Sequence, residues 1–351
     1  MSAPGLAPGA TPVRVAVVGT GPWWGREHLR AFSARTDTTL CAVVGRTPAT
    51  TQARAEEFGV SGYTDLAEML RRERPDLVAL TLPNEHHFDT TLQVIRAGYP
   101  LFVEKPLVFE LEQADVLLRE AADRELFFAI NFNHRYAEPV VRAARALADG
   151  ALGQVVLATW RFGGEAGTSR HPYANLVETQ CHGLDMLEHL CGPIDSVAAQ
   201  MTNVTGRGWS TLAVALHFAR GAVGSLVGSY DVSYAHPATH RVEVAGTDGR
   251  LVVTDTVKRF ELSRTGDETT SVWEAGYFND VDRQFHQTFD RHLDAVIPAL
   301  RAGAEPPVHA RAGRRALELA HAIIRSFEEG GRVAVDPAGY EAQVGVTDVQ
   351  R

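Results

Sequence analysis

The sequence predicts an α/β protein: an N-terminal doubly wound parallel sheet, then an α+β domain with a large, mostly antiparallel open sheet. Three observations support this fold class. Residues 13–132 alternate apolar strand segments with helical segments, an order that builds a parallel sheet with right-handed crossovers. A glycine-rich turn directly follows the first strand. Beyond about residue 131, the segments become rich in threonine and valine and are joined by short turns.

The 351 residues are enough for two domains with separate cores. We expect a disordered tail at 1–11, a dinucleotide-binding Rossmann domain at 12–130, and a substrate-binding and oligomerisation domain at 131–351. The net charge of -9 argues against a nucleic acid partner, which needs a basic face. No segment approaches the ~18 apolar residues of a membrane helix, and three cysteines are too few for a disulfide framework. We therefore expect a cytoplasmic protein without a membrane partner.

The strands expected in the first domain are apolar runs of the kind that buried parallel strands show. They lie at 13–19, 39–45, 76–83, 100–106 and 126–132, and the helices between them at 26–35, 48–59, 65–75, 87–98 and 110–125. Gly59 and Gly98 end two of these helices, and Pro75 stops a third.

In the second domain, a helix at 139–153 leads into a strand at 154–164. Further strands are expected within 210–233, 240–256 and 258–266, with hairpin turns at 220–221 and 247–249. Helices at 176–190, 281–303 and 310–330 complete the domain. We expect the helix at 176–190 to cover one face of the open sheet.

The glycine turn after the first strand is a candidate phosphate-binding loop. Glycines let backbone N–H groups approach a pyrophosphate at the N-terminus of the following helix. The third glycine comes one residue later than in the G-x-G-x-x-G fingerprint, so the spacing alone is weak evidence. The position of the motif at the first strand–helix junction is what favours a dinucleotide site. The predicted cofactor contacts here are Gly19, Gly21, Pro22, Trp23, Trp24 and Gly25.

The end of the second strand bears on the choice of cofactor. Where an NAD site expects an acidic residue for the ribose hydroxyls, the sequence has Arg46 and Thr47. A guanidinium and a hydroxyl suit a 2′-phosphate. We predict NADP, with NAD as an open alternative; a solvated loop arginine is the competing interpretation of Arg46.

Two further motifs narrow the prediction from a general fold to one protein family. The segment 81–87 reads T-x-P-N-x-x-H, and residues 104–106 read E-K-P. Together with the glycine turn, they closely resemble the Gfo/Idh/MocA family, the relatives of glucose–fructose oxidoreductase and inositol dehydrogenase. The resemblance extends from Val13 to Val335, and E-K-P in its strand–helix context is its most specific part.

The resemblance implies a nicotinamide dinucleotide cofactor and a small sugar-like substrate: a sugar, amino sugar, cyclitol or sugar nucleotide. It also implies a homodimer or homotetramer that packs through the open sheet of the C-terminal domain. The cofactor contacts it implies in the two motifs are Leu82, Pro83, Asn84, His87, Glu104 and Lys105.

Lys105 is the first candidate catalytic residue. It follows a parallel strand at the carboxyl end, where open α/β sheets bind their ligands. There its ammonium group could hydrogen-bond a reacting hydroxyl and stabilise developing alkoxide charge. From the residues alone, a surface lysine is an equal alternative; the resemblance favours the catalytic role.

The segment 177–190 gathers ionisable residues on one helical stripe. At about 100° per residue, Glu178, His182, Asp185 and His189 share a face, and Cys181 lies on the opposite, apolar side. A polar face in solvent is the plain interpretation. A metal site is disfavoured because Cys181 points away from His182, and we predict no bound metal.

The resemblance favours catalysis, because family members carry D-x-x-x-H on this helix, with the histidine as acid/base. Here Glu178 replaces the aspartate and His182 is the histidine; Asp185 and His189 are expected to support them. Weaker candidates for substrate contacts, for which packing or surface roles are equal alternatives, are Arg135, Arg161, Tyr173, Thr179 and Tyr234.

The resulting hypothesis is an NAD(P)-dependent oxidoreductase that moves a hydride between the cofactor and a secondary hydroxyl or ketone. Three alternatives stay open. A relative that retains NAD can use transient oxidation to drive elimination, as a glycosidase or lyase. A non-catalytic relative can act as a dinucleotide-sensing regulator. A metallohydrolase would require bound zinc.

Overall fold

The computed structural model describes residues 11–164, 171–276, 281–337 and 340, so the predicted tail at 1–11 lies, apart from Thr11, outside the described residues. The chain divides into two compact units. The first contains the chain up to Asn131 together with Phe289–Arg314, and the second contains Phe132–Thr288 and the chain from Arg315 onward. None of the helices in the described ranges combines the length and apolar content needed to cross a bilayer.

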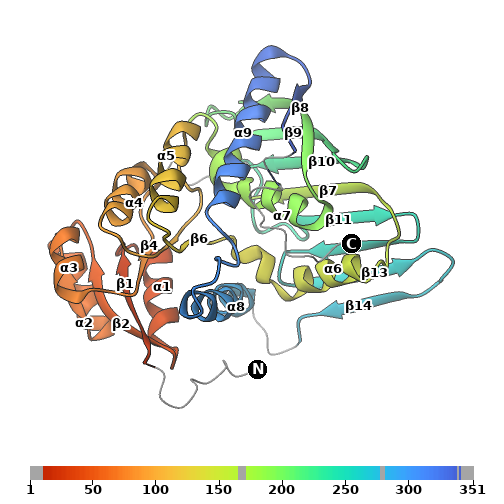
Figure 1. The fold of residues 1–351 in the computed structure, drawn as a ribbon. Coiled ribbons are helices and arrows are strands. Elements are labelled where there is room, and N and C mark those ends of the chain that lie inside the picture. Colours follow the sequence, from red (N-terminus) through yellow and green to blue (C-terminus); the bar gives the residue numbers. More distant parts are fainter. Residues whose placement is uncertain (1–10, 165–170, 277–280, 338–339, 341–351) are drawn as a thin grey trace. The chain divides into compact units, whose positions relative to one another are not determined.

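The first unit contains a six-stranded parallel sheet in the order β3-β2-β1-β4-β5-β6 (Figure 1), which confirms the predicted doubly wound sheet. The short strand β3 was not singled out in the sequence. The strands β2 and β3 are added on one side of β1, and β4, β5 and β6 are added on its other side. Ligands of such sheets bind at the carboxyl ends of the strands where this order of addition reverses. The strands are β1 (Val13–Val18), β2 (Thr38–Val44), β3 (Ser61–Tyr63), β4 (Leu77–Leu80), β5 (Leu101–Val103) and β6 (Phe128–Ile130).

The helices of this unit begin and end where local signals predict. Pro48 starts α2, and Gly59 ends it with a left-handed φ of 66°. The carboxylate of Asp65 accepts the backbone N–H of Glu68 and caps α3. The connecting helices are α1 (Trp24–Ser33), α2 (Pro48–Phe58), α3 (Leu66–Glu73), α4 (His87–Arg96) and α5 (Leu111–Ala122).

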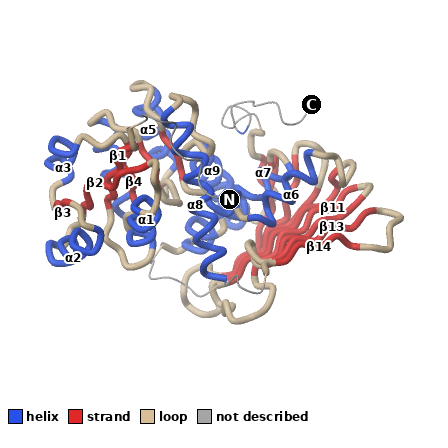
Figure 2. The backbone as a smooth tube through the Cα atoms, turned by 90° about the horizontal axis from the view of Figure 1, so that it is seen from below, coloured by secondary structure: helices blue, strands red, loops and turns tan. Residues whose placement is uncertain are grey.

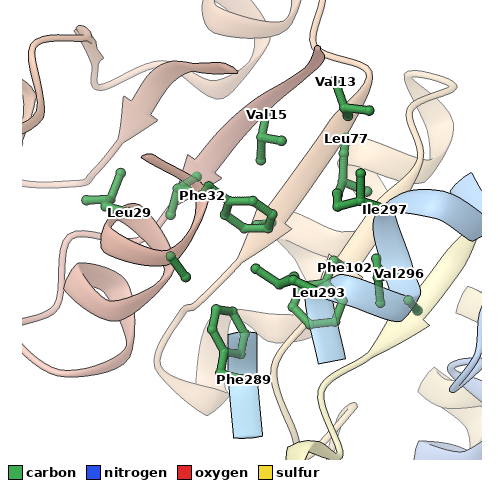
Figure 3. Packing of buried hydrophobic residues seen from close by; sticks show 14 of the residues in the cluster. Val13, Val15, Leu29, Phe32, Leu77, Phe102, Phe289, Leu293, Val296 and Ile297 are labelled. Atoms are coloured by element: carbon green, nitrogen blue, oxygen red, sulfur yellow. The ribbon is translucent and has the colours of Figure 1, made fainter. Parts of the chain in front are cut away.

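The second half of α8 (Val281–Arg301) belongs to the first unit. Its apolar stripe of Phe289, Leu293, Val296 and Ile297 is fully buried and packs with β1, α1 and β5 (Figure 3). The division of the sequence at residue 131 assigned this helix wholly to the second domain. The structure differs because the stripe completes the core of the parallel sheet, which a local pattern does not reveal.

The second unit contains a nine-stranded sheet in the order β14-β13-β12-β11-β7-β10-β9-β8-β15. Only the pair β7–β10 is parallel, which confirms the predicted mostly antiparallel sheet. The strands are β7 (Val155–Gly163), β8 (Ile194–Thr202), β9 (Thr211–Phe218), β10 (Val223–Ser229), β11 (His240–Gly246), β12 (Gly249–Thr254), β13 (Arg259–Arg264), β14 (Thr270–Glu274) and β15 (Val333–Ala334).

Helices cover one face of this sheet. The helices α6 (Glu138–Ala148) and α7 (Cys181–Cys191) lie on the same side of it in Figure 2. The backbone N–H of Ala199 in β8 donates to Ser326 of α9 (Arg311–Glu329). The predicted hairpin turns at 220–221 and 247–249 join β9 to β10 and β11 to β12.

A buried polar network lies at the carboxyl ends of β5 and β6 in the first unit. One carboxylate oxygen of Glu104 lies 2.8 Å from Nε2 of His28 and accepts a 2.7 Å hydrogen bond from Asn131. The amide oxygen of Asn131 lies 3.0 Å from Nδ1 of His292 on α8. All four side chains are buried. The network therefore links α1, two strand ends and the returning helix.

The hydrogen bonds of this network favour the ionised form of Glu104. Burial alone would raise the pKa of Glu104, but the hydrogen bonds from His28 and Asn131 outweigh it, and the pKa is lowered. A lowered carboxyl pKa contributes folding stability that is present above the unfolded pKa of ~4.3. That stability is lost as the pH falls through the folded pKa.

We predict that Glu104→Gln lowers the free energy of unfolding at neutral pH by ~1–3 kcal/mol, because the amide loses the charge-assisted hydrogen bonds. The difference from wild type should stay constant from about pH 7 to about pH 5 and shrink as the pH falls below ~4.3, toward the lowered pKa of folded Glu104. Urea denaturation across this range measures it, and Glu112→Gln on the exposed face of α5 is the control. A difference that does not change with pH would contradict the assignment of a charged Glu104.

Candidate functional site

The glycine turn after β1 is built by close backbone packing. Gly19 has a φ of 132°, and a Cβ at this position would lie 2.2 Å from the hydroxyl oxygen of Thr81. A Cβ on Gly25 would lie 2.8 Å from the carbonyl oxygen of Gly19. Any side chain at either position would push the start of α1 away from the ends of β1 and β4. The turn therefore depends on these two glycines.

The same turn fits a dinucleotide. Among the described residues, a Cβ on Gly21 would meet nothing within 4 Å, so a ligand can approach the backbone there. Gly21, Pro22 and Trp23 are exposed, the last at 60%. Exposed backbone at a helix N-terminus is the usual seat of a pyrophosphate.

Trp24 is placed differently from its neighbour. Its ring centroid lies 6.4 Å from that of His28 and 6.3 Å from that of Phe289. It therefore packs into the aromatic core of the first unit, and a contact with the cofactor stays a prediction.

Arg46 and Thr47 follow the end of β2 and are exposed. Nη1 of Arg46 lies 3.0 Å from Nε2 of His86, a residue of the short helix η1 (Asn84–His86). The contact joins the loops that follow β2 and β4. A guanidinium held at this edge is suited to an anionic group on the ribose of a bound dinucleotide.

His87 ties the two family motifs together. Its Nδ1 lies 2.8 Å from the carbonyl oxygen of Pro106, and its Nε2 lies 2.8 Å from that of Leu82. Burial lowers the pKa of His87, and a neutral ring donates to one of these carbonyls at a time. His87 thus shapes both loops, while Leu82, Pro83 and Asn84 keep partly exposed side chains.

Lys105 is half-buried and lies between two buried residues, Glu104 and Pro106. The carboxylate of Glu104 is fixed by the network described above, and the carbonyl of Pro106 is held by His87. The backbone on both sides of Lys105 is therefore anchored in the core of the first unit.

In the second unit, a π-helical turn, η3 (Asn175–Thr179), precedes α7. The backbone N–H of Gln180 donates to the carbonyl of Asn175, five residues earlier. The side chains of these two residues also bond each other, and the indole of Trp160 donates to the Gln180 amide oxygen. This clamp sets the positions of Glu178 and His182 on either side of Gln180.

The helix 181–191 is buried on nearly every side. The alternative interpretation of a polar face in solvent is therefore excluded for this helix, because long-range partners satisfy its buried charges. Asp185 accepts two hydrogen bonds from Arg135, and Glu188 accepts several from Arg315. Burial, with the nearby Arg135 charge, lowers the pKa of His189 to about 3, so this ring is neutral.

Three of the candidate substrate residues either bond to acidic side chains or point away from His182. Arg135 uses two of its nitrogens on Asp185, and the Tyr173 hydroxyl donates to Glu328. Arg161 alternates with Trp160 and Phe162 on β7, so it points to the sheet face opposite α7 and does not join His182.

Two candidates remain: Thr179, which follows Glu178 in the sequence, and Tyr234. The Thr179 hydroxyl lies 2.5 Å from that of Tyr230, whose pKa is raised by burial. Tyr234 is 56% exposed in the loop after β10. Contacts of Thr179 and Tyr234 with a substrate stay predictions.

Metal ligands do not gather in the described part of the chain. No group of three or more histidine, cysteine, aspartate or glutamate side chains there is close enough to hold a metal ion. Cys41, Cys181 and Cys191 are not joined to one another by disulfides.

Several residues that organise the site were missed in the sequence. His28, Asn131 and Gln180 carry no motif signal, because their partners lie far along the chain. Gly183 is another: a Cβ there would lie 2.4 Å from the indole nitrogen of Trp160, so glycine lets α7 pack directly on β7. Only its position next to His182 could have drawn attention to it.

Comparisons with known proteins agree with this geometry. A family profile described as an oxidoreductase family with an NAD-binding Rossmann fold matches residues 13–132, and its C-terminal alpha/beta domain matches 143–335. The inositol 2-dehydrogenase of Rhizobium meliloti is 25% identical over 341 residues, which are 92% of this chain and 99% of that protein. The D-glucoside 3-dehydrogenase of Escherichia coli is 31% identical over 153 residues, which are 43% and 44% of the two chains.

Solved structures share the fold. A levoglucosan dehydrogenase in complex with NADH and levoglucosan superposes with a TM-score of 0.83 at 18% identity, covering 93% of this chain and all of that one. Because the two profiles match most of the chain in the order of its two sheets, the protein belongs to the Gfo/Idh/MocA family of oxidoreductases, whose N-terminal domain is an NAD-binding Rossmann fold.

Proposed function

We propose that this protein is a nicotinamide-dependent dehydrogenase that oxidises a secondary hydroxyl of a sugar, amino sugar or cyclitol, or reduces the corresponding ketone. The observation that carries the proposal is the full-length likeness to an inositol 2-dehydrogenase. Lys105 and His182 are present at the positions to which the family resemblance assigns the chemistry.

His182 is proposed as the acid/base, since an imidazole titrates close to neutral pH. In the oxidation direction, the substrate O–H bond breaks as an N–H bond forms on His182, the electron pair left on oxygen forms the C=O bond, and the hydrogen of the adjacent C–H bond leaves with its electron pair as hydride. A bound nicotinamide would supply the acceptor for this hydride. In the reduction direction, His182 returns the proton to the substrate oxygen.

Lys105 and Glu178 are proposed to assist. Lys105 donates a hydrogen bond to the reacting oxygen and stabilises its negative charge. Glu178, half-buried on the turn before α7, orients His182 or holds a neighbouring hydroxyl of the substrate. The anchored backbone around Lys105 and the clamp at Gln180 support these roles, because both side chains project from rigid elements.

We predict that His182→Ala and Lys105→Ala each lower kcat/KM by ~100-fold or more, because each removes a group that transfers or stabilises charge in the reaction. The measurement follows absorbance of the reduced cofactor over a panel of inositols, sugars and amino sugars. His321→Gln and Lys258→Ala, which lie on α9 and in the turn before β13, are matched controls. Rates of the two alanine variants within a few-fold of wild type would refute the mechanism.

The preference for NADP is also a proposal. It is supported by the exposed Arg46 at the end of β2, by its contact with His86, and by the lack of an acidic residue in 45–50. The 2′-phosphate of NADP would receive charge-assisted hydrogen bonds from this guanidinium.

Arg46→Ala should weaken NADPH binding by ~10-fold or more while NADH binding changes less than ~2-fold, because a hydrogen bond to a charged group contributes ~1.5–3 kcal/mol. Fluorescence titration of each cofactor measures this, with Arg71→Ala on α3 as control. If Arg46→Ala weakened the binding of NADPH and NADH equally, or if the wild type bound NADH more tightly than NADPH, the proposed preference for NADP would be rejected in favour of NAD.

A homodimer or homotetramer through the C-terminal sheet is proposed from the sheet face opposite α7. Leu157, Val223 and Val227 are 39%, 52% and 40% exposed there. Val223 pairs with Leu157, and Val227 pairs with Arg161. An apolar patch with a charged border is typical of a surface that a partner covers.

We expect the double variant Val223→Arg, Val227→Arg to shift the particle to a smaller assembly, because buried unpaired charges disrupt an apolar interface. Light scattering after gel filtration reports the mass. Val204→Arg, at a position that is 87% exposed in the turn after β8, should leave the mass unchanged. A monomeric wild type would reject the proposed interface.

A further inference from the structure

Two buried imidazole rings lie face to face in the second unit. His134 belongs to the short helix η2 (Asn133–Tyr136), and His182 lies in the first turn of α7. Their ring centroids are 3.9 Å apart, and their planes differ by 9°. Their exposed fractions are 4% and 6%. The proposed function uses His182 and assigns nothing to His134.

Aromatic side chains enclose the pair. The ring of Phe132 meets His182 edge-on at 5.8 Å, and the ring of Phe285 meets His134 edge-on at 5.9 Å. Phe162 of β7 lies 6.3 Å from His134. These rings pack around both imidazoles, and the low exposed fractions of the pair mean that little water reaches it.

A stacked pair in such surroundings resists a second proton. Two imidazolium rings at this distance repel each other, and little solvent is present to screen them. Protonation of either ring therefore disfavours protonation of the other.

Several other charged groups on neighbouring elements are paired with each other or point away from the two imidazoles. Arg135 and Asp185 neutralise each other, Arg161 points to the opposite sheet face, and Glu138 and Arg142 of α6 pair with each other. The remaining groups on adjacent turns are Glu178, Cys181, Tyr230 and His286.

We infer that His134 is a positioning residue for His182: it holds the plane of the His182 ring and opposes protonation of that ring, so that His182 stays in the neutral form that accepts a hydroxyl proton. The inference rests on the proposed role of His182 as acid/base. His134 itself needs no contact with the substrate.

The first test is a proton titration of the imidazoles by ¹H–¹⁵N NMR in wild type, His134→Phe and His182→Phe. Phenylalanine keeps a flat ring in the stack but carries no proton. The midpoint of His182 should lie at higher pH in His134→Phe than in wild type, where the two rings titrate in coupled steps. His321→Gln is the control and should leave the His182 midpoint unmoved.

An equal His182 midpoint in wild type and His134→Phe would overturn the inference. If His134→Phe does not fold, the His134 resonance in His182→Phe reports the same coupling, because the interaction is reciprocal.

The second test compares two replacements of His134 by kinetics. His134→Ala removes the ring and should lower kcat by ~10–100-fold with KM changed less than ~3-fold, because a misplaced acid/base costs about that much. His134→Phe should recover most of kcat at neutral pH and move the acidic limb of the kcat/KM profile to higher pH. Equal kcat for His134→Ala and wild type, with the same pH profile, would refute the positioning role.

The two tests separate this inference from the proposed function. If His182→Ala stays active, the proposed mechanism fails whatever the NMR titration shows. If His182→Ala is inactive but the two imidazoles titrate independently, only the role of His134 fails.

Discussion

Burying a carboxylate costs several kcal/mol unless hydrogen-bond donors or an opposite charge replace its water, and in the described part of the chain three of the buried carboxylates are held by partners far away in the sequence. Glu104 is held by His28 and Asn131, Asp185 by Arg135, and Glu188 by Arg315. Each partner lies between 27 and 127 residues away in the sequence. The three anchors therefore specify which distant segments must meet, and they leave few alternative packings of the elements that carry them.

The candidate reactive residues stand beside these anchors. Lys105 directly follows Glu104 on the chain, and His182 lies one helical turn before Asp185 on α7. Because Asp185 holds Arg135 by two hydrogen bonds, η2 and α7 are locked in register. His134 immediately precedes Arg135, and the same lock brings its ring onto that of His182. A structural ion pair thus positions two imidazoles that would otherwise be independent.

The segment 177–190 shows which structural features the local sequence pattern can predict and which it cannot. Its periodicity correctly predicted a helix. The phase left open a polar stripe in solvent as an alternative, and the burial of the helix excludes it. Asp185 of this stripe and the neighbouring Glu188 are buried because Arg135 and Arg315, which no local pattern connects with the helix, neutralise them. The π-helical turn at Asn175–Thr179 was likewise beyond prediction, since its cause is a clamp between side chains from η3 and β7.

The sequence by itself determined the class of the fold, the order of its elements, the nucleotide-binding turn and the family, because these depend on apolar periodicity, glycine placement and short motifs that act within a few residues. Only the tertiary structure decided that the second half of α8 completes the first core, that Arg135 serves Asp185, and that His134 stacks on His182. Those outcomes depend on burial and on partners far apart in the chain, and the free energy of a buried charge or ring is set by what surrounds it rather than by its neighbours in sequence.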